Sequence, residues 1–394
     1  MPTVSLSHSH TLRLFLVFAA ACISLPAAFA QTDSSGADSS GAEPPIAIPL
    51  ADSSRIAFSP SNQTQGLTFE SAPLTLPESS TSGVQFIPPG HGYWIVSTHD
   101  LSQSFSRRSG FCPKVIRYDE CIGFRHSSLD ELLASLSPGL PVSVAAHGSF
   151  MDWQSVYTES RCTWKWLQAG RPELPLQFIY FTWPSYRPLG PIVQLDISVL
   201  GRRASLNGFY LADLLQRLPP ESPVSLIGHS HGTRVVASSL HLMGGGVVEG
   251  YSHPCVSCRN RRIRVVFAAS AIDHDWLNPD ERFGRALCCV ECLLNLRNKH
   301  DLALKLYPLR KPPFSSRSLG QAGFTEDDRE ELGYHGRKVR DLDVSRYIRD
   351  KHLWPEYYQR PWIASSISNY VYFPEAIPQP VVFQTAASGT AILR

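Results

Sequence analysis

Apolar residues recur along the chain in short runs that alternate with stretches of helical periodicity. Runs rich in β-branched and aromatic residues predict strands, and apolar residues three or four positions apart predict the helices between them. The expected strands are residues 93–98, 114–118, 141–146, 176–185, 224–227, 263–269 and 292–296. The expected helices are residues 129–136, 153–167, 196–218, 234–242 and 356–370.

The alternation of strands and helices predicts the fold class. Because βαβ units are right-handed, they build a mostly parallel β-sheet with helices on both faces. In such sheets, functional side chains gather where the strands end. Residues 147–150, the turn around Ser230, residues 270–275 and residues 297–301 meet this condition. We therefore expect an α/β domain whose site lies among these four segments.

The pattern is different before residue 93. Residues 31–60 are rich in Ser, Asp, Gly and Pro without periodicity, and prolines interrupt the stretch up to residue 89. Such composition is typical of flexible linkers. We expect a flexible N-terminal extension over residues 31–92, with one or two edge strands at most, followed by one folded domain over residues 93–394.

Residues 1–30 have the pattern of a secretory signal peptide. Arg13 precedes an apolar stretch over residues 14–21, and Ala28-Phe29-Ala30 provides a small-x-small cleavage site before Gln31. The alternatives are an uncleaved membrane anchor, for which the apolar run is short, and a lipoprotein attached through Cys22. We expect an exported protein, periplasmic, held in the cell envelope or secreted, with no membrane span in its mature chain.

The composition excludes some classes of partner. Hydrophobic residues make up 43% and charged residues 18% of the 394 residues, as in ordinary globular proteins. The formal net charge is +2, and the one short basic run, residues 259–264, leads directly into a strand. Nucleic acid is therefore not expected as a partner. The sequence gives no indication of the oligomeric state.

Gly228-His229-Ser230-His231-Gly232 carries the strongest chemical signal. It fits the pattern G-x-S-x-G, follows a predicted strand and precedes a predicted helix. A serine held in so tight a turn is crowded by the residues two positions away, and glycine relieves this crowding. Ser230 is therefore the candidate nucleophile, and an incidental glycine-rich turn is the alternative.

Four further segments accompany the turn at residues 228–232. They are His147-Gly148 after a strand, Trp183-Pro184-Ser185, residues 298–304 and a late histidine. With these segments, the chain resembles the α/β-hydrolase superfamily and, more narrowly, exported esterase/lipase-like proteins. The resemblance covers about residues 93–372 and implies an α/β-hydrolase fold and a serine hydrolase that needs neither a metal nor an organic cofactor.

The superfamily places an acid after the nucleophile. Serine is a weak nucleophile that needs a base, and a carboxylate orients the base, in the order Ser, Asp or Glu, His. Asp301 follows a predicted strand in the turn where the superfamily most often places its acid, so we favour it. Asp273 and Asp275, beyond the preceding strand, are the alternative acids, with turn formation as their other reading.

The base lies downstream of the acid in this order. His352 precedes the predicted final helix, in the kind of loop in which the superfamily carries its histidine. His335 lies in a charged stretch and is the alternative base. We favour His352 as the base.

A developing oxyanion needs preorganised backbone donors. We expect the N–H of His231, directly after the nucleophile, and a second N–H from Ser149 or Phe150. His147 is expected to fix that loop by hydrogen bonds rather than transfer protons. The side chains of His229 and His231 are expected to point away from the serine hydroxyl and to pack or line a pocket.

Residues 302–345 form an insertion between acid and histidine that is longer than a minimal connection. Residues 324–332 within it are expected to form a short helix. The insertion either covers the pocket as a lid or decorates the surface.

Nine cysteines leave eight after removal of Cys22 with the signal peptide. Cys112 and Cys121 are close enough in sequence to close a small disulfide loop. Two C-x-x-C pairs precede neighbouring strands, and export favours disulfides or buried thiols there, with Cys288 as an additional sulfur. The weaker alternative is a structural zinc ion held by Cys255, Cys258, Cys289 and Cys292.

These observations predict a serine hydrolase that cleaves a small-molecule carboxylic ester through an acyl-enzyme. An amidase or thioesterase uses the same triad and is one alternative. A non-catalytic binding protein with the hydrolase fold is the other. The acyl chain length and the physiological substrate are not encoded in these patterns.

Overall fold

The computed structural model describes residues 92–107, 110–186, 193–254, 261–310 and 316–376. The predicted signal peptide, residues 1–30, lies outside the described residues. The predicted extension lies outside them too, except for residue 92.

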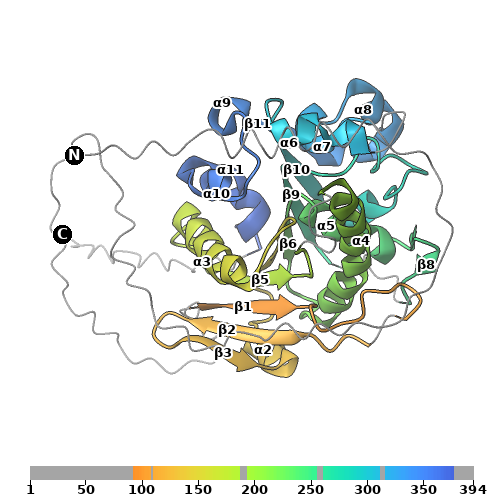
Figure 1. The fold of residues 1–394 in the computed structure, drawn as a ribbon. Coiled ribbons are helices and arrows are strands. Elements are labelled where there is room, and N and C mark those ends of the chain that lie inside the picture. The colour runs from red at the N-terminus through yellow and green to blue at the C-terminus, as the bar shows by residue number, and fades with distance from the viewer. Residues whose placement is uncertain (1–91, 108–109, 187–192, 255–260, 311–315, 377–394) are drawn as a thin grey trace, which may run out of the picture.

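Among the described residues, nine strands form one sheet, seen edge-on near the centre of Figure 1. They are β1 (Gly92–Ser97), β2 (Lys114–Asp119), β3 (Gly123–Ser127), β4 (Val142–Ala146), β5 (Gln177–Thr182), β6 (Val224–His229), β9 (Ile263–Ala268), β10 (Cys292–Arg297) and β11 (Val339–Asp343). Their order is β11-β10-β9-β6-β4-β5-β1-β2-β3. The pairs β1–β2 and β2–β3 are antiparallel and the other pairs are parallel, so the predicted mostly parallel α/β sheet is confirmed.

The chain changes direction across the sheet at β4. It leaves β4 for β5 on one side, and then returns to β6 on the other side before continuing through β9 and β10. Ligand sites of open parallel sheets form where loops diverge at such a reversal, beyond the carboxyl ends of the strands. The loops after β4 and β6 therefore diverge above the centre of the sheet.

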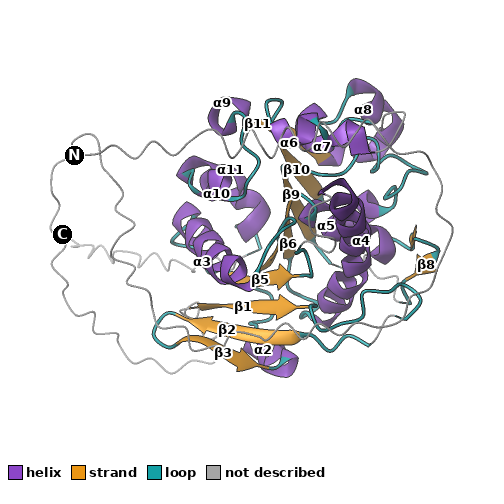
Figure 2. Ribbon diagram, in the orientation of Figure 1, coloured by secondary structure: helices purple, strands orange, loops and turns teal. Residues whose placement is uncertain are grey.

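Helices cover both faces of the sheet, as Figure 2 shows. α3 (Trp153–Gly170), α10 (Pro355–Tyr358) and α11 (Pro361–Tyr372) lie on one face, and α4 (Val193–Arg217) and α5 (Gly232–Met243) lie on the other. The shorter elements are α2 (Leu129–Ser135), α6 (Leu302–Lys305), α7 (Leu319–Ala322), α8 (Glu326–Leu332), α9 (Ser345–Ile348), the hairpin of β7 (Val247–Val248) and β8 (Tyr251–Ser252), and three 3-10 turns, η2 (Ala286–Cys289), η3 (Tyr307–Arg310) and η4 (Gly333–Lys338).

The core has two layers because side chains alternate along each strand. Leu226 and Val265 pack with α4 and α5, whereas their neighbours Ile227 and Val266 pack with α3 and α11. A parallel strand buried on both faces needs apolar residues at successive positions. This explains why the central strands are mainly apolar and why the sequence pattern detects them.

Two edge strands are absent from the sequence expectation. β3 reads GFRHS and β11 reads VRDLD, and both carry charged side chains at an edge of the sheet. Polar edge strands lack the apolar run that marks a central strand. The predicted helix over residues 356–370 is also different, because it divides into α10 and α11 before Pro361.

The insertion between acid and histidine is part of the sheet. Its residues 339–343 form β11, which pairs with β10 from Leu293 to Arg297. The expected short helix is α8, whose N-cap Thr325 and Asp328 form a capping box. The insertion is therefore more than a lid or a surface decoration, because it supplies an edge strand of the sheet.

The cysteine expectations need two corrections. Cys112 and Cys121 are exposed free thiols, because they lie at opposite ends of the six-residue strand β2, roughly 15–20 Å long. Four-thiolate zinc binding is also wrong, because Cys289 is disulfide-bonded and Cys292 is free. Cys255 and Cys258 lie outside the described residues. Within those residues, no group of three or more potential ligands has a metal-binding arrangement.

None of the helices in the described ranges combines the length and the apolar character needed to cross a bilayer.

Candidate functional site

Ser230 lies at the junction between β6 and α5, near the middle of the sheet. It adopts φ = 52°, in the left-handed region, and its residue is 7% exposed. A non-glycine residue in that region costs about 1–2 kcal/mol. The surrounding turn bears this cost and presents the hydroxyl beyond the carboxyl end of β6.

Two glycines make the turn sterically possible. A Cβ at Gly232 would lie 2.1 Å from the carbonyl oxygen of Ala146 in β4, and one at Gly228 would lie 2.8 Å from Cα of Thr233. Both obstacles are backbone atoms that cannot rotate aside. The outer positions of the G-x-S-x-G pattern therefore require glycine because strand and helix approach each other here.

His352 joins Ser230 to Asp301 through its two ring nitrogens. Nε2 lies 2.9 Å from Oγ of Ser230, and Nδ1 lies 2.8 Å from Oδ2 of Asp301. Because a carboxylate only accepts, Nδ1–H donates to Asp301 and leaves Nε2 to accept from the serine hydroxyl. The structure thus brings together the favoured nucleophile, base and acid from segments 51 and 122 residues apart.

Asp301 is fixed by both of its carboxylate oxygens. The residue is fully buried, Oδ2 faces His352, and Oδ1 accepts the backbone N–H of Leu304 at 3.0 Å. Asp301 is the N-cap of α6, where a carboxylate satisfies an otherwise unpaired N–H. The capping bond holds the carboxylate in one orientation toward the imidazole.

The loop that carries His352 is held by two side chains whose roles the sequence patterns did not predict. Asn298 donates from Nδ2 to the carbonyl oxygens of Arg349 at 2.8 Å and Lys351 at 3.2 Å. His229 donates from Nε2 to the carbonyl oxygen of His352 at 2.9 Å. Asn298 belongs to residues 298–304, one of the segments that resemble the superfamily. No local sequence pattern indicates that its amide contacts a loop about fifty residues further along the chain.

The two buried histidines beside the serine turn are uncharged near neutral pH. Burial lowers the pKa of His147 and of His229 to about 3. His147 donates from Nδ1 to the carbonyl of Gly148, and its Nε2 accepts from the Thr182 hydroxyl at 2.8 Å. These bonds fix the loop after β4, which is the structural role that the sequence suggested for His147.

The loop after β4 corrects one of the expected oxyanion donors. The N–H of Phe150 donates to the carbonyl oxygen of Ser185 at 2.6 Å, so it is already used. The described part of the chain gives the Ser149 N–H no acceptor, and Ser149 Oγ lies 2.6 Å from Nδ1 of His231. His231 begins α5, at the positive end of the helix dipole. Ser149 and His231 thus remain as candidate donors.

The alternative acids and base lie apart from the imidazole of His352. Asp273 accepts the hydroxyl of Tyr307 at 2.7 Å, and Asp275 accepts the hydroxyl of Ser316 at 2.9 Å. His335 lies in η4, with Nε2 3.9 Å from Sγ of Cys288. Asp273 and Asp275 follow the end of β9, and His335 lies in the insertion before His352. Each therefore fits the order Ser, acid, His along the chain, and this order alone could not exclude them as acid or base.

Comparison of this chain with known protein families, curated proteins and solved structures gives no match.

Proposed function

We propose that this chain is a serine hydrolase of the α/β-hydrolase fold that cleaves a carboxylic ester through an acyl-enzyme. The observation that carries the proposal is the hydrogen-bonded series Ser230–His352–Asp301, with the serine held at positive φ between β6 and α5. Each member has the chemistry that its position requires. A hydroxyl needs a neutral imidazole to take its proton, and an imidazolium needs a nearby carboxylate.

In the proposed reaction, Oγ of Ser230 attacks the ester carbonyl carbon while its proton moves to Nε2 of His352. Asp301 stabilises the resulting imidazolium through Nδ1–H. When the carbon–oxygen bond to the alcohol breaks, His352 returns this proton to the leaving alkoxide. Water then repeats the sequence on the acyl-enzyme, releases the acid and restores the serine.

The tetrahedral intermediates carry a negative charge on the former carbonyl oxygen. We assign its stabilisation to the backbone N–H groups of His231 and Ser149. Such preorganised donors typically contribute 10²–10³-fold in kcat each. The hydrogen bond between the two side chains supports this assignment, since it fixes the two donor segments relative to each other.

The immediate surroundings of the triad favour an organic substrate with an apolar part. Leu353 follows the base, Leu302 follows the acid and Phe150 follows the oxyanion loop residue Ser149, and all three apolar side chains are exposed. Exposed apolar side chains grouped around a polar centre are typical of binding surfaces. They fit the hydrocarbon portion of an ester.

Export remains part of the proposal. The disulfide at Cys289 supports it, because disulfides persist mainly in oxidising compartments outside the cytosol. The expected mature protein begins at Gln31, which N-terminal mass analysis of the extracytoplasmic fraction would detect. Recovery there of a chain that retains residues 1–30 would contradict cleavage.

A fluorophosphonate probe tests the enzyme proposal. Wild-type protein should be labelled and should hydrolyse p-nitrophenyl butyrate, whereas Ser230→Ala and His352→Ala should lose labelling and at least 10⁴-fold in kcat. Ser366→Ala and His126→Ala are matched controls, because both positions are exposed and lie away from the triad. Folded protein without Ser230-dependent labelling would instead indicate a non-catalytic binding protein.

The same preparation distinguishes the ester from its rivals. The ester should be cleaved faster than the matched p-nitroanilide and the matched thioester. A higher kcat/KM for the anilide or the thioester would identify an amidase or a thioesterase, with the triad assignment retained.

A further inference from the structure

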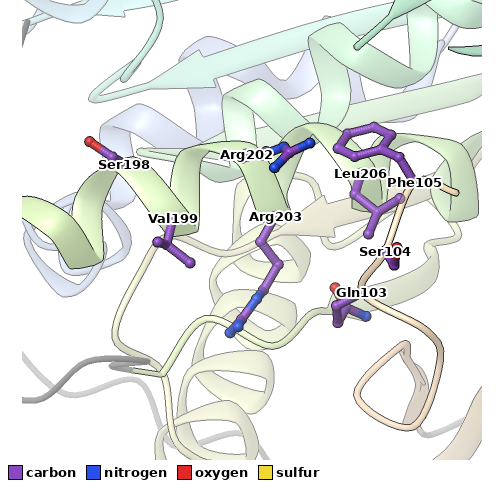
Figure 3. Close-up of a pocket in the computed structure, with 8 residues that line it drawn as sticks. All are labelled: Gln103, Ser104, Phe105, Ser198, Val199, Arg202, Arg203 and Leu206. Atoms are coloured by element: carbon purple, nitrogen blue, oxygen red, sulfur yellow. The ribbon is translucent and has the colours of Figure 1, made fainter. Parts of the chain in front are cut away.

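A cavity of about 450 Å³ lies between the segment after β1 and the helix α4. Its lining combines two arginines of α4, the half-buried Arg203 and the exposed Arg202, with polar and apolar side chains, and Figure 3 shows Arg203 extending from α4 between Val199 and Gln103. The other lining residues are Ser104, Phe105, Ser198 and Leu206. We call this space the Arg203 cavity.

The Arg203 cavity and Ser230 both lie at the carboxyl ends of the parallel strands. Because β1, β5, β4 and β6 run parallel, the segments that follow them start on the same side of the sheet. The guanidinium of Arg203 donates to the carbonyl oxygen of Pro184 at 3.1 Å. The next residue, Ser185, accepts the N–H of Phe150, which adjoins the oxyanion loop residue Ser149. Residues 184 and 185 therefore connect Arg203, which lines the cavity, to the oxyanion loop through these two hydrogen bonds.

The wall opposite Arg203 is preformed by side-chain hydrogen bonds. Asn207 of α4 donates to Oε1 of Gln103 at 2.8 Å and accepts the Thr98 hydroxyl at 2.5 Å. Tyr210 donates to the carbonyl oxygen of Ser102 at 2.7 Å. These bonds attach the segment after β1 to α4, so the cavity exists before any ligand enters.

Among the described residues, the half-buried guanidinium of Arg203 contacts the carbonyl oxygen of Pro184 and the Tyr186 ring, at 5.8 Å from its centroid, but no carboxylate. In the part of the chain that the structure describes, no Asp or Glu oxygen lies within 4.0 Å of its guanidinium, and burial lowers its pKa. Two other arginines of α4 do have carboxylate partners, since Arg202 pairs with Glu249 and Arg217 with Asp213 at 3.8 Å each. A guanidinium has five N–H donors, and Arg203 gives one of its terminal nitrogens to Pro184. The remaining donors match the geometry of a carboxylate.

We propose that the Arg203 cavity binds the carboxylate end of an elongated ester substrate, so that the enzyme prefers half-esters of dicarboxylic acids. The inference rests on the proposed ester hydrolysis at Ser230. Arg203 would pair with the free carboxylate, while Phe105, Val199 and Leu206 contact the hydrocarbon chain that leads toward the oxyanion loop. The carboxylate takes no part in bond making or breaking.

The kinetic test compares p-nitrophenyl half-esters of adipic, suberic and sebacic acid with the same esters ending in a neutral carboxamide. Wild-type protein should favour the carboxylate by at least 10-fold in kcat/KM at one chain length, mainly through KM. Arg203→Gln should reduce that preference at least 10-fold, as expected for a charged hydrogen bond. Arg203→Lys should retain several-fold of it, and Arg217→Gln, at the other end of α4, should leave it unchanged.

Arg203 also donates to the carbonyl oxygen of Pro184, so the test must distinguish a purely structural role of Arg203 from carboxylate binding. If Arg203→Gln lowers turnover of both ester series equally, the side chain only holds the segment 183–185 and the proposal is overturned. Equal kcat/KM for carboxylate and carboxamide esters at every length in the wild type would overturn it as well.

A binding measurement separates this inference from the proposed reaction. Monomethyl suberate should bind the Ser230→Ala protein, by calorimetry, at least 10-fold more tightly than it binds Ser230→Ala with Arg203→Gln. Inorganic phosphate should compete only weakly with monomethyl suberate for this site. If phosphate bound as tightly as monomethyl suberate, the cavity would be a general anion site and the carboxylate proposal would be overturned. Absence of Ser230-dependent fluorophosphonate labelling in the wild type would overturn the reaction at Ser230, whereas absence of Arg203-dependent binding would overturn the cavity assignment.

Discussion

The hydroxyl of Ser149 lies 2.6 Å from Nδ1 of His231, so one hydrogen bond joins the loop after β4 to the start of α5. Each of these residues also supplies a backbone N–H to the proposed oxyanion site. The side-chain bond therefore sets the separation between the two donors.

Replacement of this hydroxyl should impair the chemical step. We expect Ser149→Ala to lower kcat for p-nitrophenyl butyrate by about 10-fold, less than the 10²–10³-fold for loss of a donor, because both N–H groups remain. KM should change little. Steady-state kinetics with an unchanged melting temperature check this, and an unaltered kcat would show that the bond does not position the donors.

Substitution should distinguish Asp301 from Asp273, the two candidate acids of the sequence analysis. Asp301→Asn should lower kcat by about 10⁴-fold, because an amide fixes the wrong tautomer of His352. Asp273→Asn should retain most of the activity and lose about 1 kcal/mol of stability, since its partner is the buried hydroxyl of Tyr307. Ester turnover and denaturant titrations measure both effects, and an Asp273 variant as inactive as the Asp301 variant would refute the assignment.

The positive φ of Ser230 predicts a stability difference between two inactive variants. Ser230→Gly should be more stable than Ser230→Ala by about 1 kcal/mol, because glycine adopts φ = 52° without the steric cost of a Cβ. Urea unfolding of the two proteins provides the comparison. Equal stabilities would indicate that the turn stores no strain at this residue.

Glu159 of α3 predicts a pH dependence of stability away from the site. Burial raises its pKa from 4.5 to about 7, although the Tyr180 hydroxyl, which donates to it at 2.8 Å, opposes the shift. The folded protein therefore holds a proton that the unfolded chain releases above about pH 4.5. Stability falls as pH rises from there to about 7, by roughly 3 kcal/mol in all.

Glu159→Gln isolates this contribution, because an amide keeps the acceptor for Tyr180 and does not ionise. The variant should gain stability relative to the wild type between pH 5 and pH 8, and the difference should level off above pH 8. Denaturant titrations of both proteins across this range measure it. A constant difference between them would show that Glu159 is ionised throughout.

The central sheet was predictable because its strands are buried on both faces. The strands β4, β6, β9 and β10 are mainly apolar, so their existence and the location of Ser230 and Asp301 beyond strand ends follow from the sequence pattern. The edge strands β3 and β11 escape detection because hydrogen bonds to one neighbour, rather than an apolar pattern, define them.

The sequence predicted which residues belong to the candidate site better than it predicted the hydrogen bonds between them. That the N–H of Phe150 is consumed by Ser185, and that Asn298 reaches the carbonyls of Arg349 and Lys351, are long-range backbone contacts. No periodicity records which way a peptide group faces. Order along the chain left both His335 and His352 as bases, and the loop before the predicted final helix favoured His352; only the fold supplies the 2.9 Å distance to Ser230 that supports this choice.

The pairing of β11 with β10 also gives the site an order of assembly. Asp301 lies shortly after β10, whereas His352 arrives only after the chain has left the domain centre, added β11 to the edge and returned. A chain folded only as far as α6 would hold Ser230 and Asp301 but not His352. In the proposed reaction, hydrolysis would therefore require completion of the sheet, because the proposed base follows β11 along the chain.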